Sequence, residues 1–260
     1  MRAVDTPALM RGMVGLAAFI QAIDTAIVLT AVFDGNKMQL PFFDWLPVIP
    51  LPLLPLYIGI WCLAAVSFAA GRHIHIAGVI LMLAMSYAIL VDQQSYSNHV
   101  HLLILVVLLL MLPRRYSDVL LRWQMSIVYF FAAISKVNLI YISGVIVAGN
   151  LRNGWIVQLP ESLIRLEIML PLAIASICLE LFLAIAFWTP RYRPAALVVG
   201  TVFHISIVLL FPANVILQLI VFGLTMGSLY LLFLDPAVVA ERVQSAIDRA
   251  RRGITAPARS

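Results

Sequence analysis

The sequence predicts an all-α protein, a polytopic transmembrane helix bundle of about eight helices. Hydrophobic residues make up 63% of the 260 residues, and charged residues make up only 11%, against about 25% in a typical soluble protein. The mean hydropathy is +1.03. Apolar stretches near the roughly 20 residues that cross a bilayer follow one another along the chain. These observations place the protein in a lipid bilayer and exclude an ordinary soluble domain.

The expected helices follow from the positions of these apolar stretches. The first is too long for a cleaved signal peptide, contains Asp24 and precedes further spans, so we expect it to remain in the mature protein. The fourth and seventh stretches are short for a span. The expected spans are residues 13–33, 48–70, 74–91, 95–112, 119–138, 168–188, 195–211 and 215–234.

The cationic residues predict the orientation, because cytoplasmic loops carry an excess of Lys and Arg. With both termini in the cytoplasm, only three cations fall in outside loops: Lys37, Arg152 and Arg165. The cytoplasmic set is Arg2, Arg11, Arg72, Arg114, Arg115, Arg191, Arg193 and the tail arginines from Arg242 to Arg259. We therefore expect a multi-pass protein of an inner or plasma membrane whose net charge of +5 reflects topology and not nucleic-acid binding.

Three segments interrupt the pattern of spans. Residues 47–57 are rich in proline and predict an irregular entry to the second helix. Residues 137–167 are apolar but broken by glycines and a proline, which favours a partial helix folded back over the outer mouth. Residues 235–260 form a basic tail that begins as a short amphipathic helix for the inner surface. We expect one domain: a cytoplasmic N-terminus (1–12), a membrane bundle (13–234) and this tail.

Lys136 is the most informative residue, because charges inside membrane segments are rare and usually functional. It lies at the outer end of the fifth span, and an amine in a low dielectric is driven toward its neutral, basic form. A lysine that only extends to the interface is equally compatible with this position. Arg122, Tyr129 and Lys136 recur every seven residues, which predicts one inward-facing stripe on the fifth helix. For Arg122 alone, packing or topology is the favoured role.

Two further groups of polar residues can carry chemistry. The first group lies where the third span ends and the fourth begins, and it forms either a site or an ordinary polar turn capped by a serine: Asp92, Ser95, Asn98, His99 and His101.

The second group consists of Glu180 and His204, single ionisable residues within the sixth and seventh spans. A single buried histidine is more often a hydrogen-bonded core residue than a catalyst, and a single glutamate can pair with a neighbouring helix. Two such residues in adjacent spans favour a polar interior pocket, and they could equally form a proton relay. We expect no metal site, because His99 and His101, the two histidines that flank one residue, lack further ligands. Cys62 and Cys178 lie in apolar spans, so we expect no disulfide.

Several motifs of this chain resemble those of the vitamin K-dependent γ-glutamyl carboxylase and its bacterial relatives, the horizontally transferred transmembrane (HTTM) family. The resemblance covers roughly residues 91–234 and rests on the order and spacing of its motifs. The matching residues are Asp92, Ser95, Tyr96, Asn98, His99, Arg122, Gln124, Ile127 to Phe130, Lys136, Val137, Asn138, Tyr141, Gly144, Glu180, Leu181, Phe203, His204, Leu210 and Phe211.

The resemblance implies a chemistry as well as a fold. The residue that matches Lys136 is the base that deprotonates a reduced quinone of the vitamin K type, which then reacts with O2. The resulting strong base removes a proton from glutamate, CO2 adds, and the quinone leaves as its epoxide, which makes the reaction that of a lyase. By the same resemblance, His99 and His204 line the pocket and position the quinol. The substrate-binding candidates are Asp92, Asn98, Tyr129, Glu180, Arg122 and Gln124.

Two departures bear on this expectation. The carboxylase has two adjacent lysines where this chain has Ser135 and Lys136, which keeps the residue assigned as base. The large non-membrane domain that helps to recognise protein substrates has no counterpart in residues 235–260, which argues against carboxylation of a protein. We therefore expect a base, Lys136, acting on a quinol-like lipophilic molecule at an outward-facing pocket, with any protein partner left open.

Two other functions remain open from the sequence. The first is a non-enzymatic membrane subunit, structural or associated with immunity or export, whose polar groups hold helices together. The second is proton-coupled transport through Glu180, His204 and Lys136, which is weaker because the chain shows no internal repeat.

Overall fold

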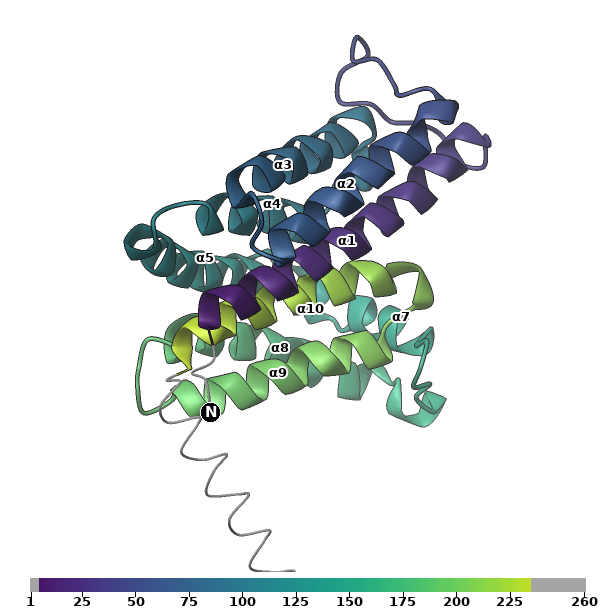
Figure 1. Ribbon diagram of the computed structural model, residues 1–260. Coiled ribbons are helices and arrows are strands. Elements are labelled where there is room, and N and C mark those ends of the chain that lie inside the picture. Colours follow the sequence, from purple (N-terminus) through teal and green to yellow (C-terminus); the bar gives the residue numbers. More distant parts are fainter. Residues whose placement is uncertain (1–4, 235–260) are drawn as a thin grey trace, which may run out of the picture.

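The computed structural model describes residues 5–234, apart from the side chain of Gln94, and these residues form helices and no β-strand (Figure 1). The ten α-helices are α1 (Thr6–Phe33), α2 (Leu54–Ala69), α3 (Ile74–Val91), α4 (Asn98–Leu110), α5 (Arg114–Ser135), α6 (Leu139–Ile142), α7 (Val145–Arg152), α8 (Leu166–Ala186), α9 (Arg193–Leu210) and α10 (Ile216–Tyr230). Short 3₁₀ turns at Leu51–Leu53, Gln93–Ser95, Glu161–Leu163, Ala213–Val215 and Leu231–Phe233 connect or end them. The predicted all-α fold is confirmed. The expected amphipathic tail and the residues before Asp5 lie outside the described residues.

Six helical segments within the described residues are long and apolar enough to cross a membrane: Thr6–Phe33, Leu51–Ala69, Ile74–Val91, Leu166–Ala186, Arg193–Leu210 and Ala213–Phe233. They correspond to six of the expected spans. The other two expected spans are also helical, but they differ in length or composition. The fourth, α4, has only 13 residues. The fifth, α5, has 22 residues but carries Arg114, Arg115, Asp118 and Arg122 in its first half.

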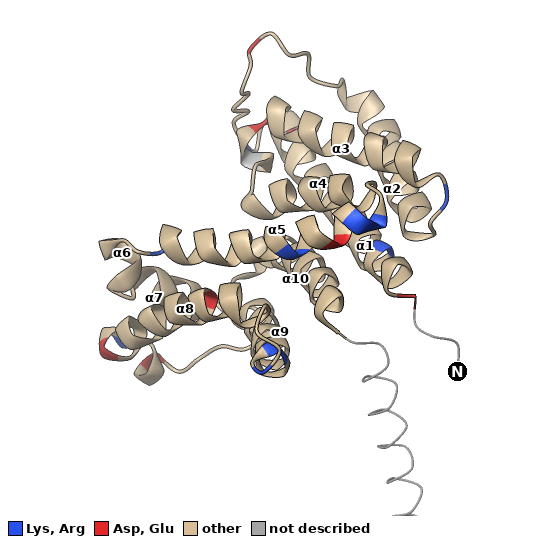
Figure 2. Cartoon of the chain, turned by 90° about the vertical axis from the view of Figure 1, so that its left-hand side faces the viewer, with Lys and Arg blue, Asp and Glu red and all other residues tan. Residues whose placement is uncertain are grey.

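Two helices begin earlier than hydropathy alone predicts. Helix α1 starts at Thr6 and not at residue 13, with Pro7 in its first turn. Helix α5 starts at Arg114, directly after Pro113, and not at residue 119. Proline suits the first turn of a helix because its missing N–H has no intrahelical partner there. A hydropathy window ends where charges begin, whereas the helix continues through them. Figure 2 shows how few charged residues lie along the helices.

Helix α10 occupies the centre of the bundle, where it packs against α1, α4, α5 and α9 (Figure 1). Helix α1 also packs along α2, and α5 packs along α8. The α1–α2 contact is close because Gly15 faces Ala65 and Ala69, and a methyl group added at Gly15 would lie 2.6 Å from the Ala69 Cβ. Small residues of this kind allow two membrane helices to approach closely.

The proline-rich segment before α2 is irregular, as expected. The Tyr87 hydroxyl of α3 accepts a hydrogen bond from the Ile49 amide at 2.9 Å and donates one to the Pro47 carbonyl at 2.8 Å. These bonds satisfy main-chain groups that no helix satisfies. Residues 137–167 contain the short helices α6 and α7, both of which pack against α8. The predicted partial helix in this segment is therefore confirmed.

Candidate functional site

Lys136 and Glu180 form an ion pair between the end of α5 and the middle of α8. The Lys136 Nζ atom lies 2.6 Å from Glu180 Oε1. The Lys136 side chain is 24% exposed and the Glu180 side chain 5% exposed. Lys136 is the C-terminal cap of α5, where the helix dipole also favours a cation. The second carboxylate oxygen, Oε2, is buried and has no hydrogen-bond partner among residues 5–234.

Aromatic rings surround the ammonium group of Lys136. Its Nζ atom lies 5.4 Å from the centre of the Tyr141 ring and 6.0 Å from the centre of the Phe203 ring, within reach of cation–π attraction. The Tyr141 hydroxyl is hydrogen-bonded to Ser176 of α8 at 2.8 Å. The pair therefore lies in a largely aromatic environment to which α5, α6, α8 and α9 all contribute.

A second cluster joins α5, α9 and α10 through three buried polar rings. The Tyr129 hydroxyl is hydrogen-bonded to Nε2 of His204 at 2.9 Å and also to the Tyr230 hydroxyl. Tyr129 is 1% exposed, His204 7% and Tyr230 5%. Phe187, the C-terminal cap of α8, stacks on both tyrosine rings, with centroid distances of 6.4 Å to Tyr129 and 5.0 Å to Tyr230.

The two clusters share α5. Tyr129 and Lys136 are seven residues apart, which is about 10.5 Å along a helix. No hydrogen bond within the described part of the chain joins one cluster to the other. The sequence-predicted residues Lys136, His204, Tyr129 and Glu180 are thus brought into one region of the bundle.

The residues between α3 and α4 lie apart from these clusters. Asp92 is fully buried, and its Oδ1 accepts a hydrogen bond from the Leu40 amide at 3.2 Å. Asn98 is exposed on the first turn of α4, and Ser97 caps that helix through the Val100 amide at 3.4 Å. His99 is half-buried with Nε2 unpaired, and no hydrogen bond or ion pair connects it to Lys136 or His204 within residues 5–234.

Arg122 and Gln124 both lie in the first half of α5, but they differ in their contacts. Arg122 donates a hydrogen bond of 2.8 Å to the Leu232 carbonyl at the end of the last helical segment, and its guanidinium lies 5.3 Å from the centre of the Phe233 ring. These contacts match the packing role favoured for Arg122. Gln124 is half-buried and forms no hydrogen bond with the described residues. All three members of the heptad stripe have partners inside the protein, which confirms that the stripe faces inward.

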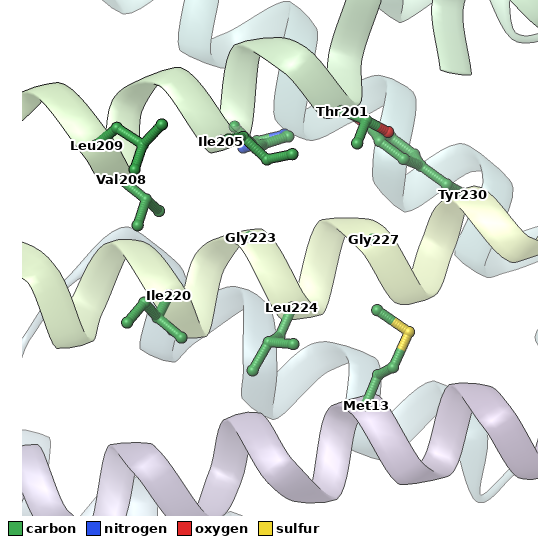
Figure 3. A pocket seen from close by; sticks show the side chains of 11 residues that line it. Met13, Thr201, Ile205, Val208, Leu209, Ile220, Gly223, Leu224, Gly227 and Tyr230 are labelled. Atoms are coloured by element: carbon green, nitrogen blue, oxygen red, sulfur yellow. The ribbon is translucent and has the colours of Figure 1, made fainter. Parts of the chain in front are cut away.

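An apolar cavity of about 330 Å³ lies between α9 and α10, with Met13 of α1 at its edge (Figure 3). His204 and Tyr230 from the buried cluster form part of its wall. The lining residues are Met13, Thr201, His204, Ile205, Val208, Leu209, Ile220, Gly223, Leu224, Gly227 and Tyr230. Lys136 and Glu180 do not line it.

Tyr230 is a buried member of the second cluster that the sequence analysis did not identify. A tyrosine near the end of a span is typical of the membrane interface. Its position in the sequence therefore does not indicate that its hydroxyl is buried and hydrogen-bonded. The signal that identifies it is structural: Gly200 of α9 leaves room where the Tyr230 hydroxyl approaches. Residues 5–234 bring together no group of three or more His, Cys, Asp or Glu side chains able to hold a metal ion.

Comparison with known proteins gives one match. The family model of the HTTM domain matches residues 6–118 and 112–236. No curated protein and no solved structure matches the chain. The two matched ranges together include every helix from α1 to α10, and the apolar helices identify an integral membrane protein. The chain therefore belongs to the HTTM domain family.

Proposed function

We propose that this integral membrane protein is an enzyme that removes a proton from a quinol-like lipophilic substrate, with Lys136 as the base. The observation that carries the proposal is the Lys136–Glu180 pair, a cation and an anion 2.6 Å apart inside an apolar bundle. Burying two charges is costly even when they are paired, and replacing such a pair with apolar residues often leaves stability unchanged or improved. A chemical role accounts for why this chain keeps the pair.

Glu180 explains how a lysine can act as a base in this position. Transfer of the Nζ proton to the carboxylate converts the ion pair into a neutral amine and a carboxylic acid, with no change in net charge. The amine then accepts the hydroxyl proton of the substrate, becomes an ammonium ion again, and stabilises the oxyanion that it has formed. The low dielectric around the pair makes the attraction between the ammonium ion and the oxyanion stronger than it would be in water.

The family resemblance supplies the remaining parts of the proposal. A reduced quinone of the vitamin K type is the proposed substrate, O2 its co-reactant, and CO2 the group added if a carboxylation follows. His204 assists on the inner side of the pair, together with Tyr129. His99, Asp92 and Asn98 stay candidates for contacts with the substrate near the start of α4.

The test measures epoxide formation by the protein in lipid nanodiscs with reduced vitamin K under oxygen. The proposal expects turnover by the wild type and none by Lys136→Ala. Lys136→Arg is the sharper variant, because it keeps the ion pair with Glu180 but arginine cannot be deprotonated. Lys37→Ala, which changes the exposed lysine of the first outer loop, is the matched control and should retain turnover. Undiminished turnover by a folded Lys136→Arg protein would overturn the assignment of the base.

A structural role is the second candidate, and two contacts between helices favour it. The Lys136–Glu180 pair joins α5 to α8, and the Arg122–Leu232 hydrogen bond joins α5 to the end of the last helical segment. A membrane subunit without enzymatic activity would use both contacts only to hold helices together. In that case no quinol is turned over, and Lys136→Arg leaves the biological function in the host unchanged.

A further inference from the structure

A further group of polar residues lies between α1 and α10, outside the two clusters described above. Gln21, Asp24 and Thr25 are three and four positions apart, so they share one face of α1. The Gln21 Nε2 atom lies 3.4 Å from Asp24 Oδ2 and 3.4 Å from Thr25 Oγ1. The Gln218 side chain of α10, which packs along α1, also interacts with the Asp24 carboxylate. These four residues form what we call the α1–α10 polar group.

The Asp24 carboxylate lies inside the membrane span without a cationic partner. Helix α1 continues for nine residues beyond Asp24, to Phe33, which is about 13.5 Å along a helix and places the carboxylate at the depth of the hydrocarbon. No Lys, Arg or His side chain among residues 5–234 lies within 4.0 Å of it. Such an anion is unfavourable in a bilayer. Its neutralisation therefore requires a positive charge from outside the described chain.

The same group contains a buried oxygen atom that is available for a ligand. Gln21 is 2% exposed, and its Oε1 has no hydrogen-bond partner among residues 5–234. The two contacts of its Nε2 are longer than the usual range of about 2.7–3.2 Å. Rotation of the carboxamide exchanges its nitrogen and oxygen. Oε1 then lies about where Nε2 was, next to Asp24 Oδ2 and Thr25 Oγ1.

The spacing of these oxygen atoms fits the ligands of one hard cation. At a metal–oxygen distance of about 2.4 Å, found for Ca²⁺ and shared by the similarly sized Na⁺, two ligands at right angles lie about 3.4 Å apart. The separations from the Gln21 carboxamide have this value. One carboxylate balances the charge of Na⁺, whereas a divalent ion would leave a net positive charge inside the span.

We propose that the α1–α10 polar group binds one sodium ion. Its ligands are one carboxylate, one hydroxyl and two carboxamide oxygens, the oxygen donors that hard cations prefer over nitrogen and sulfur. The ion neutralises Asp24 and holds α1 against α10, the helix at the centre of the bundle. This site is separate from the proposed base, since neither Lys136 nor Glu180 contributes a ligand.

Direct binding of sodium-22 to the purified full chain in nanodiscs tests the site. Choline chloride keeps the ionic strength constant. The wild type should show one saturable site per chain. Asp24→Asn removes the charge but keeps the size of the side chain, and it should abolish this binding. Asp34→Asn is the matched control, because Asp34 is an exposed carboxylate that caps the C-terminal end of the same helix. It should bind sodium like the wild type.

A second variant tests the neutral ligands. Thr25→Val keeps the shape of the side chain and removes the hydroxyl. It should weaken sodium binding about fivefold to tenfold, which corresponds to the loss of one buried polar contact. Sodium binding by Thr25→Val equal to that of the wild type would overturn the assigned ligand set.

Thermal unfolding shows whether the variants are folded and gives an independent readout. Sodium chloride should raise the Tm of the wild type and of Asp34→Asn above the value in choline chloride, because an ion that binds only the native state stabilises it. It should leave the Tm of Asp24→Asn unchanged. In choline chloride, Asp24→Asn should be at least as stable as the wild type, since it removes an unbalanced charge from the span.

Three results would overturn the proposal. The first is no saturable sodium binding by the folded wild type, and the second is equal binding by folded Asp24→Asn. The third is an infrared band of a protonated carboxyl group that Asp24→Asn removes and sodium leaves unchanged, because a proton would then neutralise Asp24. If sodium binding fails while quinol turnover still requires Lys136, the ion site is wrong and the proposed function stands.

Discussion

At the scale of single residues, the ion pair defines the chemistry of Lys136. The sequence indicated that the charge of Lys136 is unfavourable at the end of a membrane span, and it separately indicated a single acidic residue, Glu180, within another span. The structure places the two in contact, 44 positions apart along the chain. The sequence cannot supply this contact, because the register of α5 against α8 depends on how both helices pack.

Removal of the carboxylate should destabilise the protein more than removal of both charges. Glu180→Gln leaves a cation that is only 24% exposed without its counter-ion, and the usual loss is roughly 3–5 kcal/mol, with the lower end expected here because some water reaches the amine. The double variant Lys136→Met with Glu180→Gln should recover most of that loss. Thermal or denaturant unfolding in detergent measures both.

The exposed ion pair between Arg152 and Glu161 provides the control for that comparison. Its side chains are 54% and 72% exposed, so Glu161→Gln should change stability by less than about 1 kcal/mol. A double variant as unstable as Glu180→Gln alone would contradict the idea that the unpaired charge causes the loss.

At the scale of helices, α5 differs from the others because it is amphipathic and carries charges in its first half. Hydropathy therefore located only its apolar part, whereas the seven-residue spacing of Arg122, Tyr129 and Lys136 correctly predicted its inward face. The spacing of residues predicts the buried face even in a helix whose average composition is not apolar. This is because spacing determines the direction of the side chains, whereas hydropathy measures only composition.

Gly200 of α9 gives a test of how closely α9 must approach α10. A methyl group added there would lie 3.0 Å from Cζ of Tyr230 and closer still to its hydroxyl, so Gly200→Ala should push Tyr230 away from Tyr129. Overpacking of this kind costs about 1–3 kcal/mol, which unfolding in detergent can detect. Gly12→Ala, at a position on α1 where a methyl group meets nothing within 4 Å, should cost nothing. Equal stability of the two variants would show that Tyr230 can move away from Gly200 without a loss in the free energy of unfolding.

At the scale of the whole molecule, the sequence predicted the fold better than the site. Apolar stretches located every long helix, because the bilayer imposes a length and a composition on each span. The family resemblance predicted that His99, Lys136 and His204 share a pocket, and this stays a prediction. His204 lines the cavity between α9 and α10 and Lys136 does not, and His99 has no hydrogen bond or ion pair with either in the part of the chain described. The role of Tyr230 could not be predicted from the sequence, because its partner Tyr129 lies 101 positions away along the chain.

The predicted orientation leads to a labelling experiment on the whole protein. After replacement of Cys62 and Cys178 with alanine, single cysteines are introduced as Asn36→Cys, Asn153→Cys and Ala70→Cys, all at exposed positions. A membrane-impermeant maleimide should label the first two in intact cells and the third only after permeabilisation, because Asn36 and Asn153 belong to the loops with few cations. The reverse pattern would contradict a cytoplasmic location of both termini.

The short separation of Lys136 and Glu180 also determines how the site responds to membrane voltage. Two opposite unit charges 2.6 Å apart span at most about a tenth of a hydrocarbon core roughly 30 Å thick. At 100 mV, where a unit charge crossing the whole membrane changes energy by about 2.3 kcal/mol, the pair therefore changes energy by at most about 0.2 kcal/mol. Shifting the proton within the pair is thus nearly insensitive to the potential, and the same resting state persists in energised and de-energised membranes.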